Sequence, residues 1–119
     1  MEQEHLNRIE LRGHIGNIKV FIVGDSQVAR FSLATNASFR NQSGGTVIET
    51  TWHNVSAWEG AECRNLDQLQ KGDPIYVQGR IRNTRYTSAD GCERTLCEVV
   101  ASRLNVLDRG TDLPDEHIV

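Results

Sequence analysis

Apolar and polar residues alternate one by one through most of this chain, and this pattern constrains the fold more than any other feature. Ile9, Leu11 and Ile15 share one parity, and charged residues or histidine stand between them. This two-residue period is typical of a β-strand with one buried face. Glycines at positions 13 and 16 interrupt the pattern, as glycines do at a bulge or at a tight corner of a closing barrel. The first strand is therefore predicted to be long and bent.

The same alternation predicts four more strands, with one helix between the third and the fourth. It returns over residues 28–35, 46–58, 75–86 and 94–107. In residues 60–71 the period changes to three, because Cys63, Leu66 and Leu69 form a single stripe that is typical of a short helix. This order of elements is that of the oligonucleotide/oligosaccharide-binding (OB) barrel. We therefore predict an all-β fold, a five-stranded Greek-key OB barrel with one short helix between strands 3 and 4.

One domain accounts for the whole chain, because 119 residues suffice for one ordinary core but not for two. Residues 1–107 are predicted to form the barrel domain, and residues 108–119 a short acidic tail. Residues 36–45 are polar and contain glycine, so they form either a loop or the tip of a long hairpin. No apolar run approaches the roughly 18 residues of a membrane helix, and the three cysteines lack the spacing of a disulfide framework. We expect a soluble cytoplasmic protein.

Charge is distributed unevenly along the chain. The net charge is −3, but residues 5–107 hold 12 basic and 10 acidic groups, because six of the acids lie near the two ends. A local basic surface decides whether a protein binds a polyanion, more than the total charge does. The mildly basic body of the chain is therefore compatible with a nucleic-acid partner.

Four of the seven aromatic side chains stand where a small β-domain would not place core residues. Trp52 and Trp58 lie on the strand face opposite Val55, Phe39 lies in a polar stretch, and Tyr86 shares its parity with arginines. Aromatic rings stack on bases and interleaved arginines contact phosphates, so this set predicts a platform for a single strand of DNA or RNA. The alternative is that the two tryptophans pack under a loop or at a subunit interface.

A row of polar, basic and aromatic side chains follows the fourth predicted strand. Its members are Tyr76, Gln78, Arg80, Arg82, Thr84 and Tyr86, with Arg85 near the end of the strand on the other parity. Arginine beside tyrosine suits both phosphate contact and guanidinium stacking. Arg80 is therefore a candidate nucleic-acid contact, although a solvated strand face would explain any single arginine equally well.

Catalytic and metal-binding motifs are not found in the sequence. Cys92 and Cys97 are five residues apart, the four histidines are scattered, and no C-x-x-C pair or histidine pair has zinc-site spacing. There is also no glycine-rich phosphate loop and no G-x-S-x-G motif. We therefore expect no enzyme activity, no metal site and no cofactor.

Four segments of the chain carry specific motifs. They are N-R-I-E-L-R-G-H-I-G at residues 7–16, F-S-L-A-T at 31–35, T-W-H-N-V at 51–55 and K-G-D-P-I-Y-V-Q-G-R at 71–80. In order and spacing, over about residues 6–107, they resemble the bacterial single-stranded DNA-binding protein family. The resemblance implies the five-stranded barrel, assembly as a homotetramer, and coating of single-stranded DNA during replication, recombination and repair.

The resemblance also implies roles for individual residues. The family's stacking aromatics correspond to Phe39, Trp52, Trp58 and Tyr86. Its phosphate contacts correspond to Arg8, Arg40, Lys71, Arg82 and Arg85. Its subunit interface corresponds to His53 and Tyr76.

The chain departs from the family pattern at several positions. Phe39 and Tyr86 stand where tryptophan is common, and Asn54 and Thr84 stand where the family is often basic, so binding is expected to be weaker. The family's acidic tip, Asp-Asp-x-Ile-Pro-Phe, recruits replication and repair enzymes. Residues 111–119 are acidic and then aliphatic without the aromatic end, so such a recruitment tip is not evident.

The sequence thus predicts a nucleoid-associated protein that binds single-stranded DNA without strong sequence preference. Two alternatives stay open. One is an accessory or primosomal barrel that acts mainly through protein partners. The other is a structural or regulatory subunit whose two tryptophans are buried at a protein interface.

Overall fold

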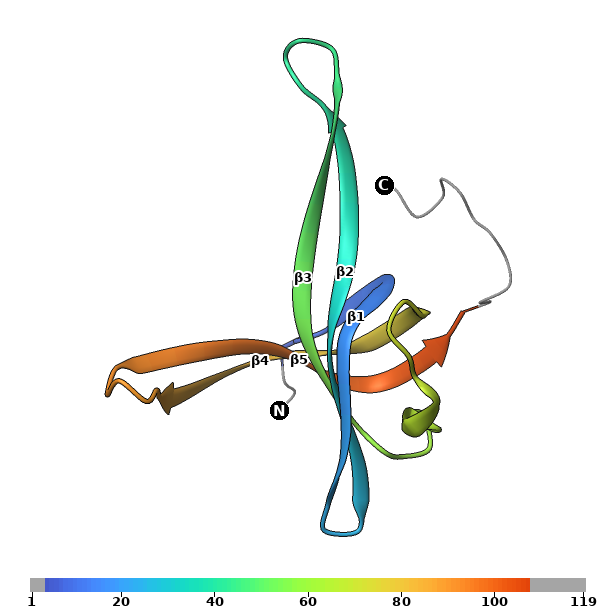
Figure 1. Ribbon diagram of the computed structural model, residues 1–119, viewed down its shortest axis with the longest axis vertical. Helices are drawn as coiled ribbons and strands as arrows, with labels where there is room; N and C mark the ends of the chain where they lie inside the picture. Colours follow the sequence, from blue (N-terminus) through green and yellow to red (C-terminus); the bar gives the residue numbers. More distant parts are fainter. Residues whose placement is uncertain (1–3, 108–119) are drawn as a thin grey trace.

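The computed structural model describes residues 4–107, which form five long strands and one short 3-10 helix. The elements are β1 (Ile9–Val23), β2 (Ser26–Arg40), β3 (Thr46–Trp58), η1 (Leu66–Gln68), β4 (Pro74–Thr87) and β5 (Glu93–Val106). The strands close into one barrel in the order β1-β2-β3-β5-β4, as Figure 1 shows. Neighbouring strands are antiparallel except β3 and β5, which are parallel. The predicted five-stranded, all-β barrel is confirmed.

The barrel interior is filled by the inward-pointing side chains of each strand, and in β5 the inward parity changes between Val99 and Leu104. The buried strand residues are Ile15, Ala29, Phe31, Leu33, Val55, Ala57, Ile75, Val77, Val99 and Leu104. Because side-chain direction reverses at each step along a strand, the intervening residues point outward. The outward residues of β3, β4 and β5 therefore form the surface on which a ligand could lie.

The stretch between β3 and β4 is where the structure corrects the sequence prediction. Cys63, Leu66 and Leu69 are buried, as a stripe of apolar residues should be, but only Leu66–Gln68 is helical. Asn65, directly before it, has a left-handed backbone (φ 57°, ψ 42°), which a continuous right-handed helix does not contain. The predicted short helix is therefore a single 3-10 turn in a loop that packs its apolar side chains against the barrel.

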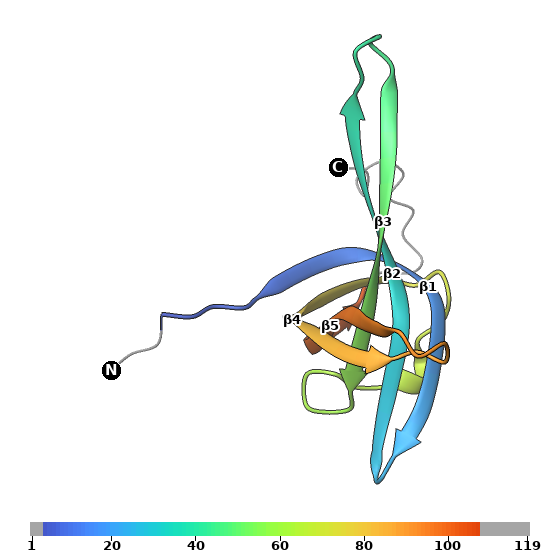
Figure 2. The same ribbon diagram turned by 90° about the vertical axis from the view of Figure 1, so that its left-hand side faces the viewer.

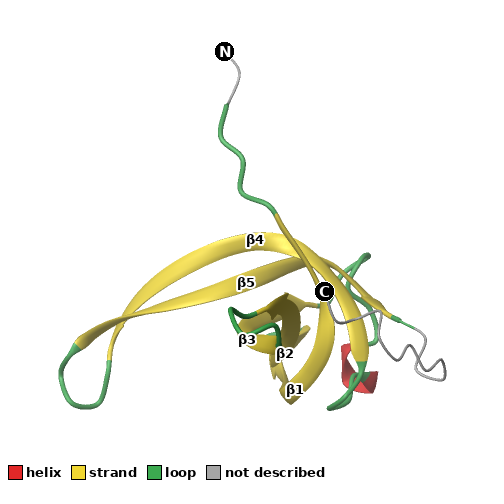
Figure 3. Ribbon diagram, turned by 90° about the horizontal axis from the view of Figure 1, so that it is seen from above, coloured by secondary structure: helices red, strands yellow, loops and turns green. Residues whose placement is uncertain are grey.

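Two hairpins extend beyond the barrel and leave it in different directions (Figures 1 and 3). β2 and β3 stay paired from Val28↔Trp58 to Arg40↔Thr46, so residues 36–45 form the tip of a long hairpin. In the β4–β5 hairpin, Ile81 has the same parity as the buried Ile75 and Val77, but it is exposed, as is every residue of β4 from Arg80 onward.

Two irregularities bend the strands around the barrel. In β1 the pairing with β2 shifts between Ile15 and Ile18, which confirms the bulge expected near position 16. In β5 the pairing with β4 shifts at Gly79, which leaves Ser102 as the extra residue. Bulges of this kind increase the local twist, and Figure 2 shows the resulting curve of β1 across the barrel.

Candidate nucleic-acid interface

The two tryptophans lie on the outer face of β3. Trp52 is 59% exposed and Trp58 is 48% exposed, whereas Val55 and Ala57 between them are buried in the core. The exposure that residue parity predicted is thus confirmed. Two large aromatic side chains left half in solvent on one strand make a surface on which planar ligands can stack.

Trp52 rests on the backbone of β1 at Gly16. A Cβ atom added at Gly16 would lie 2.5 Å from Cζ3 of Trp52 and 2.7 Å from Oγ of Ser32. Any side chain larger than hydrogen would therefore push the indole ring away from β1. The glycine leaves room for the ring against β1 while most of the tryptophan surface stays accessible.

Three charged side chains from three strands form a cluster on this outer face. The carboxylate of Glu98 on β5 accepts hydrogen bonds from Nε (3.2 Å) and Nη2 (2.5 Å) of Arg82 on β4. Its other oxygen accepts a hydrogen bond from Nη2 of Arg30 on β2, at 3.4 Å. Glu98 is only 3% exposed, whereas the side chains of Arg30 and Arg82 are 53% and 49% exposed. The acid is thus covered by two arginines whose outer surfaces remain open to solvent.

The remaining aromatic candidates lie in the two hairpin arms. Tyr86 on β4 is exposed and lies opposite Arg94, and Phe39 near the end of β2 is exposed and lies opposite Val47. The structure therefore divides the four predicted stacking residues among three places, namely the barrel face and each of the two arms. A single strand would have to run across the barrel to reach them all.

The β4–β5 turn is held by a carboxylate. Asp90 accepts hydrogen bonds from the hydroxyl of Ser88, from the backbone N–H of Cys92 at 3.0 Å and from Nη2 of Arg94 at 3.1 Å. The Ser88 hydrogen bond is the main cause that lowers the pKa of Asp90 to about 2. The turn beside Tyr86 is thus fixed by an ionised side chain over the whole neutral range.

The other basic candidates surround the barrel. Arg80 is exposed on β4 opposite Val100, and Arg40 ends β2 in the first arm. Arg85 is exposed in the second arm, 3.9 Å from Glu93. Lys71 is exposed in the turn before β4, whose Gly72 donates a backbone hydrogen bond to Ile15, the neighbour of the glycine under Trp52. Arg8 precedes β1, far from the tryptophans along the chain, and lies 3.8 Å from Glu10.

The two candidate interface residues lie on different strands, Tyr76 on β4 next to β1 and His53 on β3 next to β2. Tyr76 lies opposite Arg12, and its hydroxyl donates a 2.5 Å hydrogen bond to Glu10, which is the main cause that raises the pKa of Tyr76. His53 is half-buried, and its Nε2 lies 2.9 Å from Oγ1 of Thr35. Burial lowers the pKa of His53, so the ring favours its neutral form.

Sequence reasoning missed Arg30, Glu98 and Ser56. All three lie on the outer face, and Ser56 stands directly opposite Arg30 in the β2–β3 pairing. These residues come close to Arg82 only because β4 pairs with β5 and because β3 pairs with both β2 and β5. Sequence spacing carries no signal of that register, because the strands involved are far apart in the chain.

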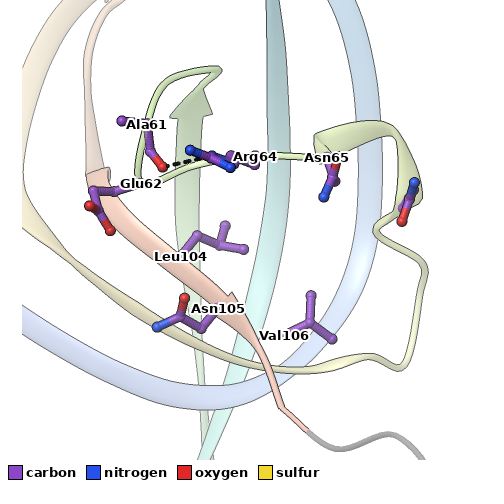
Figure 4. Close-up of a pocket in the computed structure, with 8 residues that line it drawn as sticks. Ala61, Glu62, Arg64, Asn65, Leu104, Asn105 and Val106 are labelled. Atoms are coloured by element: carbon purple, nitrogen blue, oxygen red, sulfur yellow. Dashed lines mark hydrogen bonds between the residues drawn. The ribbon is translucent and has the colours of Figure 1, made fainter.

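A pocket on another part of the molecule is lined by none of the predicted residues. It measures about 350 Å³ and lies between the 61–68 loop and the end of β5 (Figure 4). In Figure 4 the guanidinium of Arg64 points back to its own loop, where Nε donates a 3.1 Å hydrogen bond to the carbonyl oxygen of Ala61. The backbone N–H of Leu104 donates to the carbonyl oxygen of Glu62 at 3.0 Å. This bond ties the loop to β5 beyond the end of its pairing with β3.

Within residues 4–107, no group of three or more His, Cys, Asp or Glu side chains could hold a metal ion. None of the helical segments in this part of the chain has the length and apolarity needed to cross a membrane.

Comparisons with known proteins agree with the geometry. The model of the single-strand binding protein family matches residues 6–107. The single-stranded DNA-binding protein of Neisseria meningitidis serogroup A is 31% identical over 105 residues, which cover 86% of this chain and 60% of that protein. The mitochondrial single-stranded DNA-binding protein of Oryctolagus cuniculus is 30% identical over 118 residues, covering 92% and 80%. The chain thus spans about 60% of the length of the Neisseria relative.

Among solved structures, the chain is similar to the Plasmodium falciparum SSB in its complex with ssDNA. The TM-score is 0.76 and the sequence identity is 30%, over 91% of this chain and 100% of that one. The likeness thus covers most of this chain, and that protein was solved with a bound single strand of DNA.

Proposed function

The chain belongs to the single-strand binding protein family, and from this premise we propose that it binds and coats single-stranded DNA without strong sequence preference. One observation supports the proposal most: the half-exposed Trp52 and Trp58 flank the part of β3 that lies beside the arginines of the outer face. Rings that stack on any base, next to cations that follow the backbone, are what sequence-independent binding requires.

In this proposal the bases stack on the tryptophans first and on the two arms where the strand reaches them. Arg40, Arg80, Arg82 and Arg85, together with Lys71 and Arg8, neutralise phosphates. Duplex DNA hides its bases inside the helix and would meet only the cations. The role is therefore binding and protection of single strands during replication, recombination or repair, in the cytoplasm at the nucleoid, with no catalytic step. The barrel domain of residues 1–107 carries it, and the predicted acidic tail lies outside the described residues.

Tryptophan fluorescence tests this function. Addition of poly-dT should quench the emission strongly, because stacking on a base brings the indole into contact with it, whereas duplex DNA of the same length should quench it little. An equal response to both would contradict the stacking mechanism. An emission spectrum that changes with neither poly-dT nor duplex DNA would favour the alternative in which a protein partner covers the two tryptophans.

We also propose that the protein is a homotetramer, and one structural feature supports self-association. The pairs between β1 and β2 begin at His14↔Ala34, so the earlier part of β1, from Ile9, is paired to β4 only. An unpaired strand edge presents backbone donors and acceptors to another chain. Tyr76 pairs with Arg12 on the other side of this part of β1, and the family resemblance implies that Tyr76 and His53 lie at a subunit interface.

Native mass measurement tests the assembly. The wild-type mass should be a multiple of 13.4 kDa, with four copies favoured. His53→Lys should shift it toward the monomer, because an unpaired charge buried between subunits is costly to desolvate. Asn54→Lys is the matched control: it adds the same charge one residue along β3 on the exposed side and should leave the mass unchanged. Equal masses for all three proteins would place the interface elsewhere.

A further inference from the structure

We propose that Glu98 is a positioning residue that holds Arg30 and Arg82 as one preformed site for a single phosphodiester group, beside the base-stacking tryptophans. This inference rests on the proposed function and adds to it a phosphate site that includes an acid. A count of basic residues alone would not select Glu98 as part of such a site. The site is made by three strands that meet on the outer face of the barrel, β2, β4 and β5.

The burial of Glu98 is the first argument. A carboxylate removed from water is costly unless it is paired and hydrogen-bonded, and Glu98 is both, at 3% exposure. Both of its oxygens accept hydrogen bonds from arginine. Glu93 is the other acid of β5 that faces an arginine of β4. It is exposed and lies 3.9 Å from Arg85, so it constrains the Arg85 side chain much less. Glu98 therefore fixes its two arginines in a way that a surface ion pair does not.

The N–H groups of Arg30 and Arg82 that do not bind Glu98 are the second argument. A guanidinium has five N–H groups. Arg82 uses its Nε and Nη2 on Glu98, and Arg30 uses only its Nη2. Both arginines are half-exposed, so their remaining N–H groups can bind a phosphate oxygen in a fork-like geometry. The cluster carries a net charge of +1, which matches the single negative charge of one phosphodiester.

Ser56 is the third argument. Its hydroxyl is buried on the outer face opposite Arg30, and it is the one buried side-chain polar atom without a hydrogen-bond partner among the residues that the structure describes. A buried hydroxyl normally has a partner. Ser56 therefore places an unsatisfied hydrogen-bonding group directly beside Arg30, at the edge of the proposed site.

Two substitutions of Glu98 separate positioning from simple charge. Glu98→Gln removes the charge, and Glu98→Asp keeps it but shortens the side chain so that it no longer reaches both arginines. If Glu98 positions the arginines, both variants should bind oligo-dT more weakly. Both should also have a slope of log K against log salt that is less steep by about 0.7, the value for one lost phosphate contact on a single strand. A purely structural role would lower stability without moving this slope.

The opposite role makes different predictions. If Glu98 only subtracts charge from the binding face, Glu98→Gln should bind more tightly with a steeper slope, and Glu98→Asp should match the wild type. Either result would overturn the inference. Glu93→Gln is the control on the same strand. Its slope of log K against log salt should be at least as steep as that of the wild type. Should Glu98→Gln fail to fold, Glu98→Asp still decides the question.

A double-mutant cycle completes the test. Arg30→Ala should make the slope less steep in the wild-type background but have little further effect in the Glu98→Asp background, because the site is already lost. Full additivity would contradict a shared site. A wild-type protein that does not bind oligo-dT would refute the proposed function itself. Wild-type binding with unchanged slopes in both Glu98 variants would refute only this inference.

Discussion

Replacement of Trp52 or Trp58 by alanine should weaken binding of oligo-dT by about 1–3 kcal/mol for each base that loses its stacking partner, which is roughly 5- to 150-fold in affinity. Both side chains are about half-exposed on the outer face, so their removal takes little from the core. Stacking releases few counterions, so the loss should be nearly the same at every salt concentration. Anisotropy of a dye-labelled oligo-dT measures this affinity without relying on the tryptophans.

Ile48→Ala is the matched control for these variants. Ile48 is a large apolar residue that is exposed on the same strand, in the arm of the β2–β3 hairpin. Its removal should change the affinity little, because an aliphatic side chain offers no ring for a base. A comparable loss in Ile48→Ala would mean that general surface contact, and not stacking, drives the binding. Unfolding of either tryptophan variant would show that the ring supports the fold.

Gly79→Ala should lower the free energy of unfolding by about 1–3 kcal/mol or more, the usual cost of forcing an extra group into a packed site. The added Cβ would overlap the carbonyl of Val100 and crowd the backbone of Ala101 on β5. Backbone atoms cannot move aside as a flexible side chain can, and this is the point where the β4–β5 pairing is already shifted. In a domain of this size the melting temperature should fall by about 4–8 °C for each kcal/mol.

Gly45→Ala provides the comparison, because it makes the same chemical change at an open position. A Cβ there would lie 3.5 Å from the side chain of Asn41, an ordinary contact, so stability should stay within about 0.5 kcal/mol of wild type. Urea unfolding of the three proteins measures both changes. Equal stabilities of the two variants would show that the β4–β5 pairing at Gly79 tolerates an added methyl group.

Parity was sufficient to predict the strands and the exposure of Trp52 and Trp58, since alternation is a local property of each strand. It does not hold for Ile81, which shares the parity of the buried Ile75 and Val77 but is exposed, because β4 is exposed on both faces from Arg80 onward. The stripe of Cys63, Leu66 and Leu69 correctly marked buried residues, but a period of three does not distinguish a helix from a loop with apolar anchors.

The Arg30, Glu98 and Arg82 cluster lay beyond sequence reasoning for a different reason. Its three members come from β2, β5 and β4, and only the register of the barrel brings them within hydrogen-bond distance. A single acid on a strand gives no sign that it will be buried between two cations. For the candidate contacts themselves, the structure supplies places and exposures, and their roles stay predictions until binding is measured.

The parallel contact between β3 and β5 closes the barrel with three residue pairs, Val55↔Val99 to Ala57↔Ala101. The other strand pairs either belong to hairpins or extend over longer stretches. During synthesis, the hairpin of β2 and β3 is complete long before residue 99 leaves the ribosome, so until then the second edge of β3 has no partner in its own chain. Such an edge can pair with a neighbouring nascent chain. The period of greatest risk for strand exchange between growing chains is therefore set by how quickly the ribosome delivers β5.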